Sequence, residues 1–342
     1  MTARKAVRYG RSRRPLSGVD AVVFDCDGVL VDARRSYDET IRVVAEAMVK
    51  ETTGTAVDLR KSAPLLISRI RRTGGFNNDW DTTYALTMFS VAALDGKGGS
   101  TTKRLDAIVR RFGSKARIGG ARDVDAFLEQ EPEDPNLGNA REEMGYPGTP
   151  PGSRMATLFD EIYFGSALFK RVRGVDSKSK RKRGLIELER ILLDEKTLRR
   201  LSEILGGRRL ALATGRPYLG TKHTLGKLMR WFDKDASIFI GDADIVPELA
   251  KTLERYRKPS GASLLRARDK LSSDALLYVG DSAEDLMMVQ DARPEFGGLR
   301  FAGVSETSPD PEKLTSYFDR GGADVMVRSV NQIPDVLEGA RR

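Results

Sequence analysis

The sequence is poor in the residues that build disulfides and histidine metal sites. Its 342 residues include one cysteine, Cys26, and one histidine, His223. A single cysteine excludes an internal disulfide framework and suits a reducing compartment, so we expect a cytoplasmic protein. A single histidine excludes a multi-histidine metal site, and we interpret His223 as a residue of a helix surface or a core.

Long apolar runs are missing as well. None approaches the roughly 18 residues that a membrane-spanning helix needs. The first fourteen residues also lack the apolar stretch of a secretory signal. We therefore expect no membrane partner.

Two basic segments account for the excess of positive charge in a chain whose net charge is +9. Six positive residues and no acid occur in the first fourteen positions, and residues 170–183 hold eight more, relieved only by Asp176. Basic segments can bind nucleic acid, but more often they are solvated and mobile. We interpret residues 1–18 as a basic, disordered arm, and binding of nucleic acid through it stays an alternative.

A short apolar strand followed by two carboxylates organises the rest of the sequence. Residues 22–24 are typical of a buried parallel strand. Asp25 and Asp27 follow, and Gly28 permits a turn that brings both acids over one pocket. Cys26, between them, is expected to point into the core. Open α/β sheets bind ligands beyond the carboxyl ends of their strands, so these acids lie where such a sheet places its chemistry.

The remaining pattern predicts one sheet interrupted by a long helical insertion. Residues 33–207 show no series of alternating strands, and strands then alternate with helices to the end of the chain. We predict an α/β fold with a doubly wound, parallel, Rossmann-like sheet and a large inserted helical domain. The predicted boundaries are 19–33 with 205–342 for the sheet domain, and 34–204 for the insertion.

Polar residues also close the later predicted strands. Thr214 and Gly215 end one strand, and Asp281 and Asp285 follow another. A threonine hydroxyl and a glycine N–H at a helix N-terminus can hold phosphate oxygens, although such residues also serve as helix caps. Carboxylates clustered at several strand ends would repel one another without a cation, and magnesium prefers oxygen ligands.

These motifs resemble those of the haloacid dehalogenase (HAD) superfamily, most of whose members are magnesium-dependent phosphatases. The first motif of that superfamily, Asp-x-Asp-Gly-x-Leu-x-Asp, fits residues 25–32. The resemblance implies that Asp25 is a nucleophile that forms an aspartyl-phosphate, and that Asp27 is the general acid and base. It implies Mg²⁺ held by the Asp25 and Asp281 carboxylates and the Asp27 backbone carbonyl. Asp285 would support this ion directly or through water.

The resemblance also assigns phosphate-binding residues. Thr214 matches the second motif and would hold phosphate together with the backbone N–H of Gly215, and Lys258 matches the third motif. An ammonium group at that position would neutralise the phosphate and Asp25. Lys222, eight residues after Thr214, is the alternative to Lys258.

The insertion lies between the first and second motifs, where HAD proteins of subclass I carry a helical cap. A polar and aromatic string within it makes Asn77, Asn78 and Trp80 possible substrate contacts, and Arg216 beside Thr214 is another. The alternative for the string is that its polar residues only form turns and helix caps.

We therefore expect a magnesium-dependent phosphatase similar to the phosphoglycolate phosphatase branch of the superfamily. Its substrate would be a small phosphorylated metabolite, either phosphoglycolate-like or a sugar phosphate monoester. A phosphomutase or phosphotransferase with the same residues is one alternative, in which a hydroxyl group replaces water as the acceptor. A polynucleotide end phosphatase or nucleic-acid-binding protein that uses the basic arm is the other.

Overall fold

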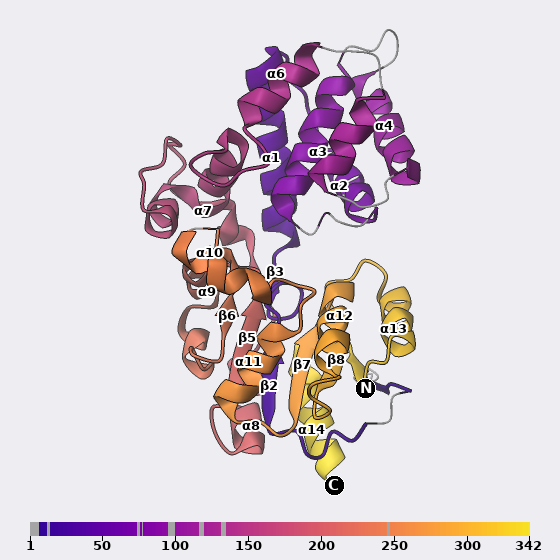
Figure 1. The fold of residues 1–342 in the computed structure, drawn as a ribbon, viewed down its shortest axis with the longest axis vertical. Coiled ribbons are helices and arrows are strands. Elements are labelled where there is room, and N and C mark those ends of the chain that lie inside the picture. Colours follow the sequence, from indigo (N-terminus) through magenta and orange to yellow (C-terminus); the bar gives the residue numbers. More distant parts are fainter. Residues whose placement is uncertain are drawn as a thin grey trace, which may run out of the picture. The chain divides into compact units, whose positions relative to one another are not determined.

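The computed structural model describes the chain apart from residues 1–6, 12–13, 74–75, 77, 95–99, 116–119, 131–134 and 245–246. Two compact units make up the chain (Figure 1). One contains the residues up to Ala33 together with Glu189–Arg342, and the other is Arg34–Leu188. The first unit holds the sheet, and the second is helical.

A seven-stranded sheet forms the first unit, in the order β1-β9-β8-β7-β2-β5-β6. The neighbouring strands from β9 to β6 run parallel, and β1 pairs antiparallel with β9. The strands are β1 (Arg8–Tyr9), β2 (Ala21–Phe24), β5 (Leu210–Thr214), β6 (Ile238–Phe239), β7 (Leu276–Gly280), β8 (Arg300–Val304) and β9 (Val325–Val327). The predicted α/β fold with a mostly parallel sheet and an inserted helical region is confirmed.

Strand β2 lies between β5 and β7 and is fully buried. Its last residue, Phe24, pairs with Leu212 of β5 and Val279 of β7. This register brings the residues that follow three strands to one edge of the sheet, because parallel strands end on the same side. The register therefore places Asp25 beside the ends of both neighbouring strands.

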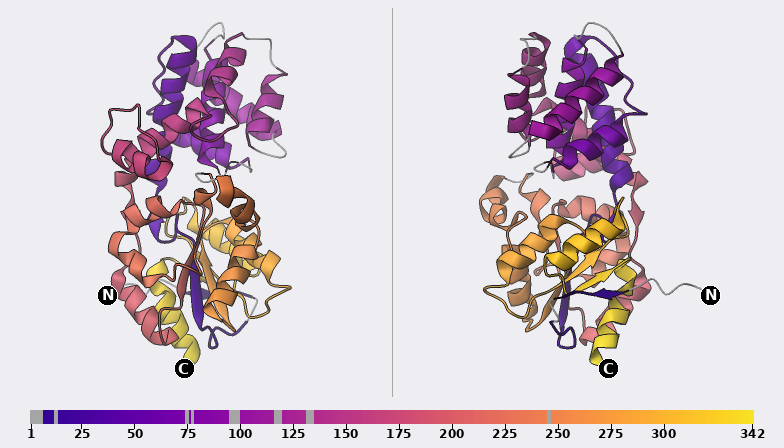
Figure 2. Two further views of the ribbon diagram at one scale, coloured as in Figure 1. Left: turned by 60° about the vertical axis from the view of Figure 1, so that its left-hand side comes forward. Right: turned by 90° about the vertical axis from the view of Figure 1, so that its right-hand side faces the viewer.

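Helices cover both faces of this sheet (Figure 2). α8 packs against α14 on one face, and α11 packs against α12 on the other. The helices of the unit are α8 (Glu195–Leu205), α9 (Tyr218–Leu225), α10 (Pro247–Leu253), α11 (Ala262–Leu271), α12 (Ala283–Ala292), α13 (Pro311–Arg320) and α14 (Ile333–Arg341). Covering both faces removes the apolar strands from water, which is the main favourable term in folding such a sheet.

The helical unit is built around α3 (Asp79–Ala92), which packs against all six of its other α-helices. These are α1 (Arg34–Thr53), α2 (Ala63–Arg71), α4 (Thr101–Lys115), α5 (Ala121–Leu128), α6 (Pro135–Met144) and α7 (Arg154–Arg173). Residues 82–91 of α3 are buried on every side. Its buried hydroxyls stay hydrogen-bonded because Thr87 and Ser90 donate to carbonyls one turn earlier. Among the described residues, no helix is both long and apolar enough to cross a membrane.

Helix α7 bends where two glycines bring separate stretches of backbone together. Gly165 adopts φ 72° and ψ 161°, which is not helical. A Cβ atom on Gly184 would lie 2.1 Å from the carbonyl oxygen of Tyr163. The chain beyond the helix is fixed beside the bend, where Ser166 N–H donates to the carbonyl of Arg181 at 2.9 Å.

The boundary of the insertion differs from the sequence prediction. The sequence predicts that it ends at residue 204, whereas the helical unit ends at Leu188. Residues Arg190–Ile191 form β4, which pairs with β3 (Val31–Asp32), and α8 then packs against α14 of the first unit. The periodic apolar residues of α8 identify it as a helix, but they do not show which of the two units it packs against.

The predicted disordered arm over residues 1–18 is wrong for much of the part that the structure describes. Arg8–Tyr9 form β1 on the open edge of β9, and Arg14 lies 3.7 Å from the buried Asp324 carboxylate. The edge of a sheet offers unpaired backbone groups, and a two-residue strand is too short to give a periodic signal.

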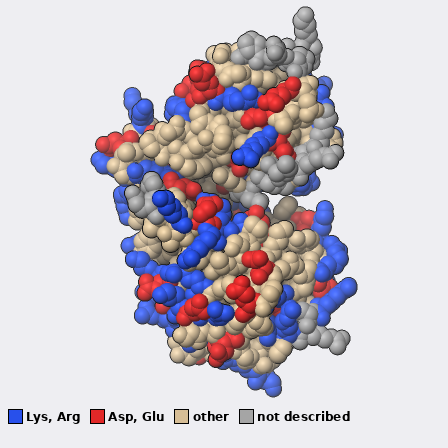
Figure 3. Space-filling view, in the orientation of Figure 1, with Lys and Arg blue, Asp and Glu red and all other residues tan. Residues whose placement is uncertain are grey.

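Positive charge is partly compensated by neighbouring acids. On the face shown in Figure 3, Lys and Arg are interspersed with Asp and Glu over both units. Within the basic segment 170–183, Lys170 pairs with Asp176 at 2.8 Å. Arg183 lies 3.8 Å from Glu187. Exposed pairs of this kind contribute little to stability, and they reduce the field of the segment.

The substitution Gly184→Ala tests the backbone crossing at the bend of α7. The new methyl group would meet the Tyr163 carbonyl oxygen, so we expect the full-length protein to lose at least about 2 kcal/mol of unfolding free energy. Gly138→Ala in α6 is the matched control. That glycine is exposed with open space around it, and alanine there should stabilise the helix by about 0.5–1 kcal/mol. Denaturant unfolding of both variants in parallel measures the two opposite shifts, and equal effects would contradict the crossing.

Candidate active site

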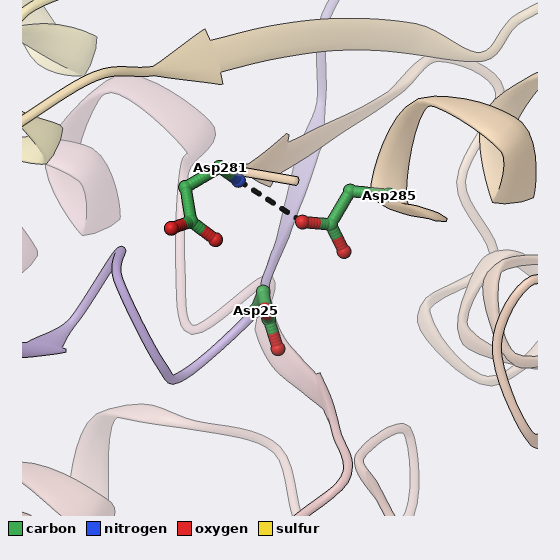
Figure 4. Close-up of side chains that lie close together, drawn as sticks. All are labelled: Asp25, Asp281 and Asp285. Atoms are coloured by element: carbon green, nitrogen blue, oxygen red, sulfur yellow. Dashed lines mark hydrogen bonds between the residues drawn. The ribbon is translucent and has the colours of Figure 1, made fainter. Parts of the chain in front are cut away.

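Three carboxylates meet at the ends of the central strands. Asp25 follows β2, and Asp281 and Asp285 lie between the end of β7 and the first turn of α12. One oxygen of each lies within 4.8 Å of the others, and Figure 4 shows the three side chains gathered at the strand ends. The structure thus brings the carboxylate of Asp25 together with those of Asp281 and Asp285.

A glycine turn makes room for this cluster. Gly28 has φ 76°, and a Cβ atom there would lie only 1.8 Å from Asp281 Oδ2. The turn is closed by Gly28 N–H, which donates to the Val31 carbonyl at 2.8 Å. Only glycine combines this backbone conformation with so close an approach of a carboxylate.

Lys258 lies between two of the acids. Its ammonium Nζ is 2.9 Å from Asp25 Oδ1 and 2.6 Å from Asp285 Oδ1. Burial by itself would lower the pKa of Lys258, but the carboxylates of Asp25 and Asp285 outweigh it and raise that pKa well above its usual value. Lys222, the alternative, is exposed on α9 with its Nζ 5.8 Å from the centre of the Tyr218 ring. The structure therefore brings Lys258, and not Lys222, into contact with Asp25.

Asp285 accepts hydrogen bonds on both of its oxygens. Oδ1 accepts from Lys258 Nζ and from the Tyr278 hydroxyl at 2.7 Å. Oδ2 accepts from the backbone N–H of Asp281 at 3.0 Å, and from the N–H and hydroxyl of Ser282 at 2.9 and 2.8 Å. Although burial would raise it, the pKa of Asp285 is lowered by Lys258 and by these hydrogen bonds. With five donors, Asp285 is suited to orienting Lys258 and the turn at 281–282.

The two other acids carry charge that burial makes unfavourable. Burial raises the pKa of Asp25 to about 7 even though Lys258 opposes the shift. Burial, together with the charges of Asp285 and Asp25, raises the pKa of Asp281 well above its usual value. A hard cation with oxygen ligands would relieve this repulsion, so the donor set at the cluster fits Mg²⁺.

The Asp27 side chain does not belong to the acidic cluster. Arg216 donates to both of its oxygens, with Nε 2.9 Å from Oδ1 and 3.0 Å from Oδ2. Arg216 also donates to Glu189, at 2.9 and 2.8 Å. From the sequence we predict Arg216 as a possible substrate contact. In the structure its side chain is 2% exposed and lies between the carboxylates of Asp27 and Glu189.

Thr214 and Gly215 lie next to the cluster along the sheet edge. Thr214 ends β5, the neighbour of β2, and its hydroxyl accepts from Arg216 N–H at 3.2 Å. Gly215 is exposed in the turn before α9. Both residues are thus at the same edge of the sheet as Asp25, where a phosphate group could be held.

The remaining predicted residues have local structural roles or lie elsewhere. Asn77 lies outside the described residues. Asn78 caps α3 by accepting from Trp80 N–H at 2.9 Å, and Arg173 lies 5.8 Å from the centre of the Trp80 ring. In the sheet unit, His223 is exposed on α9, and Cys26 is fully buried as expected.

Sequence reasoning missed Tyr278 and Glu189. Tyr278 is two residues before Gly280 on β7, so both positions lie on the same face of the strand. A Cβ atom on Gly280 would lie 2.4 Å from the Cβ atom of Asp285, so this face meets Asp285, and the period of the strand could have indicated Tyr278. Glu189 lies in a short irregular stretch of acidic and basic residues, and no local pattern distinguishes it from its neighbours.

Comparisons with known proteins identify one family and structures of similar fold. Residues 19–293 match the family described as "Hydrolase: haloacid dehalogenase-like hydrolase". No curated protein matches the sequence. The chain resembles the solved structure "Phosphatase Tt82 from Thermococcus thioreducens", with 21% identity over 93% of this chain and 99% of that chain and a TM-score of 0.57. It also resembles a structural-genomics target, with 18% identity over 94% and 99% and a TM-score of 0.60. At these identities the likeness to solved structures shows the fold alone.

Removing the charge of Lys258 tests its position between buried acids. Lys258→Met leaves Asp25 and Asp285 without their shared ammonium, so we expect a loss of about 3–5 kcal/mol in unfolding free energy. Lys222→Met is the matched control on the exposed face of α9, where the loss should stay below about 1 kcal/mol. Denaturant unfolding without divalent cations measures both, and a small effect of Lys258→Met would refute the shared ion pair.

Binding of Mg²⁺ should be visible as stabilisation that depends on pH. Because the pKa of Asp25 is raised to about 7, folding favours its protonated form, and the metal-free protein should lose stability as pH rises from about 4 to about 7. Mg²⁺ at ~100 times its dissociation constant should restore ~2.7 kcal/mol. We expect a larger rise in melting temperature at about pH 8 than at about pH 5, since protonated carboxyls bind the ion poorly.

Two variants separate this effect from general ionic stabilisation. Asp281→Asn should abolish the Mg²⁺-dependent rise, because it removes a carboxylate of the cluster. Asp235→Asn makes the same chemical change at an exposed position and should preserve the rise. Equal Mg²⁺ responses in both variants would exclude the cluster as the binding site.

Proposed function

Because this chain belongs to the haloacid dehalogenase-like hydrolase family, we propose that it is a magnesium-dependent phosphatase that forms an aspartyl-phosphate on Asp25. Its substrate would be a small phosphate monoester, such as a phosphoglycolate-like compound or a sugar phosphate. The observation that carries the proposal is the position of Asp25, buried at the end of β2 with Lys258 at 2.9 Å. A carboxylate held in this way is suited to attack phosphorus.

The phosphate would be held by groups on neighbouring strand ends. The Thr214 hydroxyl and the Gly215 N–H can donate to phosphate oxygens at the entry to α9. The Lys258 ammonium supplies a fixed positive charge, oriented by Asp285. Mg²⁺, held by the carboxylates of Asp25 and Asp281 and the backbone carbonyl of Asp27, would neutralise negative charge on the phosphoryl group.

Hydrolysis then needs two displacements at phosphorus. In the first, an Asp25 oxygen forms a bond to phosphorus while the bond to the leaving oxygen breaks, and Asp27 gives that oxygen a proton. In the second, Asp27 takes a proton from water as the water oxygen attacks phosphorus and Asp25 is released. The position of Asp27, two residues beyond Asp25 and directly before the Gly28 turn, supports this division of roles.

The helical unit would act as a cap of subclass I that selects the substrate. It is inserted between β3 and β4, after the turn that carries Asp25 and Asp27. A small substrate suits a site that a separate unit can shield from water. Within this unit, Asn78 and Trp80 remain candidate substrate contacts at the start of α3.

Asp25→Asn should reduce phosphate release by roughly 10⁴-fold or more, as loss of a covalent nucleophile does in other enzymes. Release of inorganic phosphate from a panel of metabolite phosphates, with and without Mg²⁺, measures this loss. Asp235→Asn is the matched control and should keep full activity, because this aspartate is exposed on the loop before β6.

Several outcomes would overturn the proposal. Full activity of Asp25→Asn would exclude the aspartyl-phosphate. Activity that is unchanged when Mg²⁺ is removed would exclude the metal requirement. Formation of an isomeric phosphate ester without release of inorganic phosphate would identify a phosphomutase instead.

A further inference from the structure

A buried row of alternating charges leads away from Asp27. Arg216 donates to Asp27 on one side and to Glu189 on the other, with Nη2 2.5 Å from Asp27 Oδ1 and 2.8 Å from Glu189 Oε1. The Thr224 hydroxyl donates to Glu189 Oε2 at 2.6 Å. The proposed mechanism uses Asp27 but gives no role to Glu189.

Burial makes this arrangement rigid. The Arg216 and Glu189 side chains are 2% and 1% exposed, whereas that of Asp27 is 38% exposed. A buried charge that loses its partner is strongly destabilised, so the guanidinium and the Glu189 carboxylate hold each other in place. Planar, two-pronged contacts to two carboxylates fix the orientation of Arg216 as well as its position.

The segment that carries Glu189 is tied to the turn that carries Asp27. Glu189 directly precedes β4, and β4 pairs with β3 at the end of the Asp27 turn. Leu192 N–H also donates to the Leu30 carbonyl at 2.8 Å. Backbone pairing and the Arg216 contacts therefore connect the same two stretches of chain.

We propose that Glu189 is a positioning residue for Asp27, acting through Arg216. By holding the guanidinium from the buried side, Glu189 sets where Arg216 can donate, and Arg216 in turn sets the direction of the exposed Asp27 carboxylate. This inference rests on the proposed function, in which Asp27 gives a proton to the leaving oxygen during formation of the aspartyl-phosphate. Misdirection of Asp27 then weakens proton transfer while the attack by Asp25 is unaffected.

The dependence of rate on the leaving group tests the inference. An alkoxide leaving group needs a proton from Asp27, whereas 4-nitrophenolate departs readily without one. Glu189→Gln keeps the shape of the side chain, but it removes the charge and places an amide donor against the guanidinium. In this variant we expect the first-turnover rate with an alkyl phosphate to fall ~10-fold relative to the rate with 4-nitrophenyl phosphate. This fall is smaller than the full contribution of a general acid, because Asp27 itself is still present.

Glu187→Gln is the matched control, since Glu187 is two residues away and lies 3.8 Å from the exposed Arg183. Its ratio of the two rates should equal that of the wild-type protein. The ratio is measured on one sample, so it does not depend on how much of each variant is folded. In an Arg216→Met background, Glu189→Gln should produce no further change in the ratio, because the effect passes through Arg216.

The possible outcomes distinguish failure of the positioning role of Glu189 from failure of the proposed phosphatase function. If the wild-type protein with Mg²⁺ releases no phosphate from either ester, the proposed function fails and the inference fails with it. If the wild-type protein is active but Glu189→Gln slows both substrates equally or neither, the inference alone is overturned. A further change in the Arg216→Met background would likewise overturn action through Arg216.

Discussion

The ammonium of Lys258, held between Asp25 and Asp285, is the interaction on which the rest of the site depends. Two carboxylates are buried within hydrogen-bonding distance of one nitrogen. Neither acid could be buried as a carboxylate without a nearby positive charge, and Lys258 could not be buried as an ammonium without the acids. Asp285 is fixed further by Tyr278 and by the turn at 281–282, so the position of Lys258 is set from the side opposite Asp25. A charge held in this way requires no reorganisation when a second anion arrives.

The sheet topology explains how distant residues share this interaction. Strand β2 lies inside the sheet, with β5 and β7 on either side, and the carboxyl ends of these three parallel strands lie at one edge. Residues nearly 260 positions apart, Asp25 and Asp281, thereby become neighbours. The fully buried strands resist displacement, so the carboxylates sit on a stiff support. Asp27 differs, because it lies in a turn and depends on the Arg216 contacts for its direction.

Much of this arrangement follows from local sequence, and the rest does not. Apolar strands that end in Asp25, Thr214 and Asp281 predict both the parallel sheet and the meeting of those residues at one edge. The helical insertion follows from 3.6-residue periodicity, but its end does not, because the period of α8 is the same whichever unit the helix packs against. The five donors to Asp285 and the contact between Arg216 and Glu189 depend on side chains brought together only by tertiary packing. Strand β1 was not predicted, because its two residues are extended only through their pairing with the edge of β9.

That same strand has a consequence for any shortened form of the chain. β9 would otherwise be the outermost strand on its side, and its backbone donors and acceptors are met by Arg8 and Tyr9. In a form that lacked these residues, β9 would be an exposed edge strand with unpaired backbone N–H and C=O groups and apolar side chains. An exposed edge strand of this kind can pair with a strand of another copy of the chain. Removal of residues that take no part in catalysis would therefore promote association between molecules.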